Sequence, residues 1–443
     1  MIIAKMGVYV VKNVRTLMFI CTKLRKHVKF SIQYIDRMFV ARPFMLELFT
    51  GIKHLEIIEY DRGKCASPGL FSKNIFGNLK TLIIPSILIF LLNEYSTGLD
   101  HSSDYCLDHS SDYSSRMCYS SSHPQKSSFS LCTTYFLPKL KSLTITEEYH
   151  RDFSGTNIGL DIDPGIMPCL REVKMFKCML NNINQFKTLE VLDISNTTTD
   201  ISILNKLNIS ELRIFNVDQF HNNRKELDIP SLRKLTIRGY FSSMNLNNLN
   251  LTELILLNIE CSYDYLNDRS CLSSMKIPTL RKLVLKGVAS DNIYVSEDDS
   301  GLCDGYMDIG YLTNLNIEEL ILADVEHCHY IGSTIPSLRK LVLISSGDVS
   351  IEEFPNLERL TMFKSYLTSP NRRMEKLNKI NTIESLPTWK FNSLTYPRLR
   401  NLNIHERDEE SLKDTLRNLE KDMPDVVVSS DRQKSMSKFR YLM

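Results

Sequence analysis

A six-residue phrase of apolar and polar positions recurs along most of the chain. Its first, fourth and sixth residues are apolar, as in Leu251, Leu254 and Leu256, and most copies begin 19 to 23 residues after the previous one. Apolar residues that alternate over a short run are typical of a strand with one buried face. A unit of this length is typical of a solenoid, in which each repeat packs against its neighbours. The copies begin at Ile52, Leu79, Leu140, Leu170, Leu189, Ile209, Leu232, Leu251, Leu280, Ile317, Leu338, Leu357 and Leu399, with a degenerate copy at Leu377.

The phrase Leu-x-x-Leu-x-Leu at this period resembles the leucine-rich repeat family, and the resemblance covers most of the 443 residues. It implies an α/β solenoid of about 14 coils, a horseshoe with a parallel β-sheet on its concave face. A helical N-terminal cap and a C-terminal cap of one helix and one strand are expected at the ends. Because the resemblance is to an architecture, it implies a shape more than a ligand.

Two forms of the phrase alternate between residues 207 and 343. One is entered through proline, as at Pro230, Pro278 and Pro336, which suits the residue that enters a strand. The third residue of the phrase changes sign from one form to the other. Equivalent residues of neighbouring parallel strands lie about 4.8 Å apart, so we expect a ladder of paired charges, with a charged ligand site as the alternative. The ladder residues are Glu211, Lys234, Glu253, Lys282, Glu319 and Lys340.

The fifth and seventh residues of the phrase predict an apolar stripe on the concave face. They point away from the first, fourth and sixth residues, because side chains alternate along a strand. An exposed apolar stripe with charged borders is typical of a protein-binding surface. The alternative is that β-branched residues are present because they favour strands. The candidate partner-binding residues are Phe176, Phe215, Ile255, Leu257, Val284, Ile321, Val342, Ile344 and Phe363.

The eighth position is polar or small in many copies, whereas the leucine-rich repeat family usually has its asparagine at the ninth. This departure predicts an irregular horseshoe. The return segments are short enough to favour extended, 3₁₀ or brief helical turns over long helices. The eighth residues include Asn196, Asn216, Gly239, Asn258, Gly287 and Asp324.

Residues 1–50 lack the phrase, and apolar residues at helical spacing predict a helical head. The stretch that begins at Val14 and leads into the repeats resembles a degenerate F-box, although the opening Leu-Pro of that pattern is absent. The resemblance implies a ubiquitin-ligase adaptor bound through residues 6–50. The alternative is a cap that covers the open edge of the first coil.

The remaining boundaries follow from composition and from the spacing of apolar residues. The repeat solenoid is expected over residues 51–405, a C-terminal cap over 406–430 and a mobile tail over 431–443. A Ser/Tyr-rich insertion at 93–135 has too few aliphatic residues for a core, so a disordered loop is expected. An acidic insertion at 290–310 is expected to form a solvated loop. A strand hidden between residues 286 and 316 is an open possibility.

The net charge and the cysteine pattern limit the classes of partner and the cellular compartments that are expected for the protein. The 54 Lys and Arg nearly balance the 52 Asp and Glu, which does not favour nucleic acid. The 11 cysteines lack a Cys-x-x-Cys pair, a usage typical of a reduced compartment, so a cytoplasmic or nuclear location is expected. No membrane segment, metal site or cofactor is expected.

The sequence contains no catalytic or phosphate-binding motif of the common kinds. The leading hypothesis is therefore a non-catalytic scaffold that binds a protein partner on its concave face. The second hypothesis is a substrate receptor of an SCF-type ubiquitin ligase that uses the F-box-like head. An enzyme or enzyme regulator is the third.

Overall fold

The computed structural model forms two compact units, residues 1–198 and 199–443, and each is described by itself. Helices and strands below refer to the residues that the structure describes. These are 37–40, 53–57, 77–85, 129–131, 137–146, 158–162, 164–180, 182–196, 201–216, 227–239, 246–258, 260–261, 275–287, 289–290, 309–325, 334–346, 349, 351–365, 373–383, 395–405, 413, 417, 419 and 421–429.

The first unit contains a parallel sheet whose strands pair in the order β1-β2-β3-β5-β7-β9. A separate three-stranded sheet pairs β4, β6 and β8 in parallel. The bounds are β1 Arg37–Val40, β2 His54–Ile57, β3 Thr81–Pro85, β4 Phe129–Leu131, β5 Ser142–Thr146, β6 Ile158–Ile162, β7 Glu172–Phe176, β8 Cys178–Leu180 and β9 Val191–Ser195.

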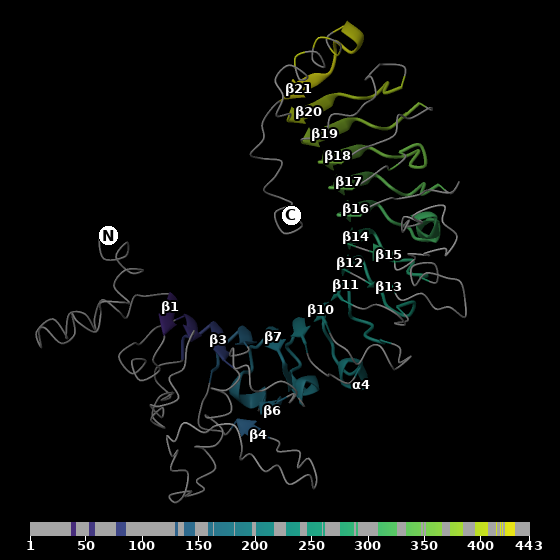
Figure 1. Ribbon diagram of the computed structural model, residues 1–443. Helices are drawn as coiled ribbons and strands as arrows, with labels where there is room; N and C mark the ends of the chain where they lie inside the picture. The colour runs from purple at the N-terminus through teal and green to yellow at the C-terminus, as the bar shows by residue number, and fades with distance from the viewer. Residues whose placement is uncertain are drawn as a thin grey trace, which may run out of the picture. The chain divides into compact units, whose positions relative to one another are not determined.

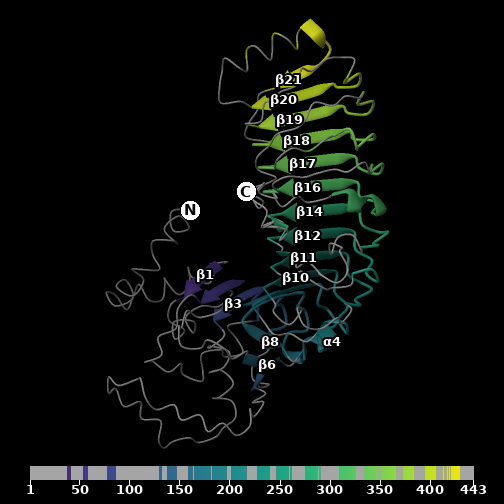
Figure 2. The same ribbon diagram turned by 45° about the vertical axis from the view of Figure 1, so that its right-hand side comes forward.

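The second unit contains a longer parallel sheet, in the order β10-β11-β12-β14-β16-β17-β18-β19-β20-β21, and its strands stack one after another in Figures 1 and 2. Strands β13 (Glu260–Cys261) and β15 (Ala289–Ser290) pair with each other in a small second sheet. The bounds are β10 Glu211–Phe215, β11 Lys234–Arg238, β12 Glu253–Leu257, β14 Lys282–Lys286, β16 Glu319–Ala323, β17 Lys340–Ile344, β18 Arg359–Phe363, β19 Lys379–Ile383, β20 Asn401–His405 and β21 Val427–Ser429.

Every copy of the phrase forms a strand, including the degenerate copy at Leu377. The first, fourth and sixth residues are buried on one side, as Leu251, Leu254 and Leu256 are, with 0 to 1% of each side chain exposed. Burial of one such side chain contributes roughly 1.5 to 3 kcal/mol. A slip of one residue would turn this whole set to the other face, so the phrase fixes the register.

The prolines stand in tight turns just before the strands. Pro230 follows Ile229, whose carbonyl accepts a hydrogen bond from the N–H of Leu232 at 3.0 Å. The same bond recurs from Leu280 to Ile277 at 3.1 Å. Proline is thus the second residue of a four-residue turn, where its fixed φ is favourable and its missing N–H is not needed.

The described return segments contain short helices, as predicted. They are η2 (Pro164–Ile166), η3 (Ile183–Gln185), α4 (Ile201–Leu204) and η5 (Ile309–Asn314).

The eighth residue of the phrase adopts a left-handed backbone conformation at the end of each of nine strands. Asparagine, aspartate and glycine tolerate this conformation best, which explains the polar or small residues there. At Asn216 the N–H donates to the carbonyl of Arg238 on the next strand at 2.9 Å, so the turn also links neighbours. The residues with positive φ are Lys177, Asn196, Asn216, Gly239, Asn258, Gly287, Asp324, Ser345 and Lys364.

Two predicted boundaries need correction. Residues 37–40 were expected within the helical head, but they form β1, which pairs with β2. Phe39 and Val40 are an aromatic and a β-branched residue, types that favour strands. Residues 129–131 of the expected disordered insertion form β4. The rest of the head, most of insertion 93–135, residues 291–308 and the tail 431–443 lie outside the described residues.

In the described sheet of the second unit, β14 and β16 pair directly, with no strand between them. Strand β15, which follows β14 in the sequence, belongs to the small second sheet. At the C-terminal end, β21 is the strand predicted there, and Lys413, Arg417, Leu419, Lys421 and Asp422 are helical.

Candidate protein-interaction surface

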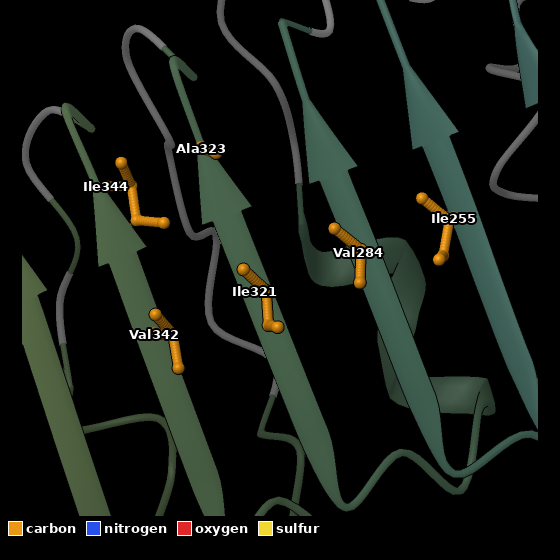
Figure 3. Packing of buried hydrophobic residues seen from close by; sticks show 6 residues of the cluster. All are labelled: Ile255, Val284, Ile321, Ala323, Val342 and Ile344. Carbon is orange, nitrogen blue, oxygen red and sulfur yellow. The ribbon is translucent and has the colours of Figure 1, made fainter. Parts of the chain in front are cut away.

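The fifth and seventh residues of the phrases point to one side of the second unit's sheet, and we call this side the front face. It corresponds to the face predicted as concave. Its centre is a group of six apolar side chains on β12, β14, β16 and β17, which lie side by side in Figure 3. This front cluster consists of Ile255, Val284, Ile321, Ala323, Val342 and Ile344.

The front cluster is buried, so the prediction of an exposed apolar stripe is wrong for its members. Ile255 is 8% exposed, and Val284 and Val342 are 0% exposed. The strands run in register, which places each fifth residue between its equivalents on both neighbours. Side chains held about 4.8 Å apart in this way contact one another, and β-branched residues pack well there. Ala323, the seventh residue of its phrase, belongs to the cluster as well.

Larger apolar residues form a partly exposed border to the front cluster. Leu257 on β12 and Phe363 on β18 pack against it and are half-buried. Phe215 on β10 is half-buried as well. The ammonium group of Lys364 lies over the ring of Phe363, 5.5 Å from its centre. These residues are the candidates of the predicted stripe that still offer apolar surface on the front face.

In the first unit, Phe176 ends β7 and is half-buried. The ammonium group of Lys177 lies 5.9 Å from the centre of its ring. Phe176 thus belongs to the sheet of the first unit and is not part of the front face.

The ladder of alternating charge is present, and the strand register pairs its six residues in the predicted order. Lys282 Nζ lies 2.9 Å from a carboxylate oxygen of Glu253, and Lys340 Nζ donates to Glu319 at 2.7 Å. Lys234 lies between Glu211 at 3.5 Å and Glu253 at 3.8 Å. These charges neutralise one another, which favours the structural interpretation over a charged ligand site.

The ladder changes character beyond β17. The third residues of the phrases that form β17, β18 and β19 are Lys340, Arg359 and Lys379, three cations on adjacent strands. Arg359 is exposed and Lys379 is half-buried. Among the described residues, Arg359 and Lys379 take part in no ion pair. The sequence carries this signal at the third position of its last phrases, but the prediction of the ladder stopped at Lys340.

Polar side chains replace the apolar ones in the fifth-residue column beyond β17. Asn381 Nδ2 donates to Thr361 Oγ1 at 3.2 Å, and Asn403 Nδ2 donates to Asn381 Oδ1. The front face therefore changes along the stack from an apolar centre to a polar and cationic region on β18, β19 and β20.

Two buried groups have shifted acidities. Burial raises the pKa of the Cys178 thiol from 9.0 to about 12, although a backbone hydrogen bond from Phe176 acts in the other direction. Burial also raises the pKa of the Tyr396 hydroxyl. Both shifts keep the group neutral, so neither side chain is activated as a nucleophile or base.

The described residues contain no group of three or more His, Cys, Asp or Glu that could hold a metal ion. Within the same residues, no helix is long and apolar enough to cross a membrane.

The arrangement defines a repeat protein in which successive copies of one phrase form successive parallel strands. No family model and no curated protein matches the chain. A solved structure of a leucine-rich repeat protein from Leptospira interrogans is similar, at 14% sequence identity and a TM-score of 0.31, and the match covers 88% of this chain and 99% of that one.

Proposed function

We propose that the protein is a non-catalytic scaffold that binds a protein partner on the front face of its second unit. The observation that carries the proposal is the border of half-buried apolar residues, Leu257 and Phe363, beside the front cluster. Large apolar side chains that stay partly exposed on a rigid surface commonly supply most of the energy of a protein interface. The satisfied charge ladder beside them would supply a polar rim.

The chemistry of the described residues agrees with a binding role. The titratable groups with resolved shifts are kept neutral by burial. The parallel strands hold the front face in a fixed geometry, so little conformational entropy is lost when a partner binds.

Affinity purification with quantitative mass spectrometry tests the proposal. The full chain is compared with the double variant Leu257→Ala, Phe363→Ala. Since two apolar anchors at an interface cost about 1 to 2 kcal/mol each when truncated, recovery of the bound proteins should fall about tenfold or more.

The matched control truncates two other half-buried apolar residues away from the front face, Ile203 in α4 and Val426 in the turn before β21. It should keep the bound proteins. Equal recovery with the front-face variant and the control would contradict the proposed surface.

The ubiquitin-ligase alternative depends on residues 6–50, of which the structure describes only β1. Since β1 pairs with β2, a truncation that removes residues 1–36 leaves the sheet intact. Loss of a co-purified ubiquitin-ligase adaptor from this truncated chain would support the alternative, and an adaptor retained by it would exclude residues 6–36 as its binding site.

A further inference from the structure

The break in the charge ladder at β18 is unfavourable for the fold. From β10 to β17 each third residue faces the opposite charge on its neighbouring strands. At β18 the pattern would continue with an acid, but Arg359 stands beside Lys340 on one side and Lys379 on the other. Like charges directly opposite each other on neighbouring strands repel and destabilise a sheet.

The surroundings do not remove this repulsion. Glu319, the nearest acid of the column, already binds Lys340 at 2.7 Å. Glu358, which precedes Arg359, lies 3.8 Å from Arg339 instead. Arg359 and Lys379 thus leave two positive charges uncompensated within the described part of the front face.

We propose that Arg359 and Lys379 are the docking site for an acidic segment of the protein partner. Two carboxylates of that segment would lie over the two cations and complete the alternation that the sheet itself leaves unfinished. The guanidinium of Arg359 offers two parallel N–H donors to one carboxylate, and Lys379 offers a point charge to the next. This inference rests on the proposed function, since it names the partner's chemistry for the same face.

The side chains next to the two cations fit such a segment. Phe363 lies on β18 four residues after Arg359 and on the same face of the sheet. Its half-buried ring can contact an apolar residue that flanks the carboxylates. Asn381 and Asn403 form a line of amides beside the cations and offer polar contacts to a peptide backbone. The charged anchor and the apolar anchor would then lie on one face, with the column of Thr361 and Asn381 between them.

Binding of a fluorescein-labelled peptide of ten glutamates to the full chain, followed by fluorescence anisotropy at low salt, tests the site. The double variant Arg359→Glu, Lys379→Glu should weaken binding about tenfold or more, since two charge contacts become repulsive. The control variant Lys206→Glu, Lys276→Glu makes the same change of charge at two exposed lysines of the return segments and should bind as the unaltered chain does. Equal loss in both variants would overturn the proposal, because binding would then depend on net charge alone.

The single variant Arg359→Glu separates binding from folding. It places an acid between Lys340 and Lys379 and so completes the alternation of the ladder. Its thermal unfolding midpoint should therefore rise by about 1 to 3 °C while peptide binding falls. A lower midpoint would overturn the argument from the broken ladder.

A ten-nucleotide single strand of thymidines serves as the competing polyanion. Tighter binding of this strand than of the glutamate peptide to the same two cations would overturn the choice of a protein segment. If the glutamate peptide does not bind while capture of partners still depends on Leu257 and Phe363, the inference fails and the proposed function stands.

Discussion

Thr382 occupies the sixth position of its phrase, beside Met362 and Ile404 on the neighbouring strands. Its side chain is 1% exposed, and within the described part of the chain its hydroxyl has no hydrogen-bond partner. A buried hydroxyl without a partner loses its hydration with no compensation. Thr382→Val keeps the shape of the side chain, so the free energy of unfolding in urea should rise by about 1 kcal/mol.

Thr361 provides the matched control, because its hydroxyl accepts a hydrogen bond from Asn381. Thr361→Val should lower the free energy of unfolding. A decrease with Thr382→Val would show that the Thr382 hydroxyl makes a favourable contact.

Cys178 links stability to pH. Its pKa is raised from 9.0 to about 12 in the folded chain, so the folded state holds this proton where the unfolded state has released it. The resulting stability is present below pH 9 and is lost as the pH rises toward 12. Between these values the free energy of unfolding should fall more steeply for the unaltered chain than for Cys178→Ala, by about 1.4 kcal/mol per pH unit. Identical slopes in chemical denaturation would contradict the burial of this thiol.

At the scale of elements, the charge ladder predicts how the free energy of unfolding changes when the two charges of one ion pair are exchanged between neighbouring strands. Glu319→Lys removes the ion pair with Lys340 and places a third positive charge between Lys282 and Lys340. The free energy of unfolding should fall by about 1 kcal/mol, since these groups are partly exposed. Adding Lys340→Glu should restore most of the loss, because the new acid then lies between the lysine introduced on β16 and Arg359 on β18. Additive losses in the double variant would show that the residues at positions 319 and 340 do not interact.

The phrase was sufficient to predict the strands, because its alternation of apolar and polar residues specifies both a β-strand and the face of that strand that is buried. Strand β1 was missed, since Met38 and Phe39 also continue the helical spacing of Ile32 and Ile35. Short strands such as β4 and β13 contain two or three residues, too few for a periodic signal.

The positive φ of the eighth residue favours asparagine, aspartate and glycine at that position. In the sequence this preference is visible as a polar or small residue at the eighth position, where the family pattern has its asparagine at the ninth. Its cause is visible only in the backbone. Gly287 has φ +56°, and an added Cβ would lie 2.6 Å from Asn258 Oδ1, so the two residues are adapted to each other across neighbouring strands. That adaptation depends on a close approach that residue types alone do not specify.

At the scale of the whole molecule, the sequence located the candidate surface but gave the wrong exposure for its centre. Alternation tells to which side Ile255, Ile321 and Val342 point, whereas burial depends on what surrounds them there. The remaining half-buried residues, Leu257 and Phe363, and the cations beyond the ladder now define the region to test. Arg359 on β18 and Lys379 on β19 could be recognised as a pair of uncompensated cations only from the strand register, which makes them neighbours.

The most direct measurement is zero-length carbodiimide cross-linking of the full chain with its captured partner, mapped by mass spectrometry. This reagent joins a lysine to a carboxylate in contact with it. We expect bonds between partner Asp or Glu residues and Lys379 on the front face, and their loss in the Arg359→Glu variant. Partner bonds confined to Lys206 and Lys276 of the return segments, with none at Lys379, would contradict it.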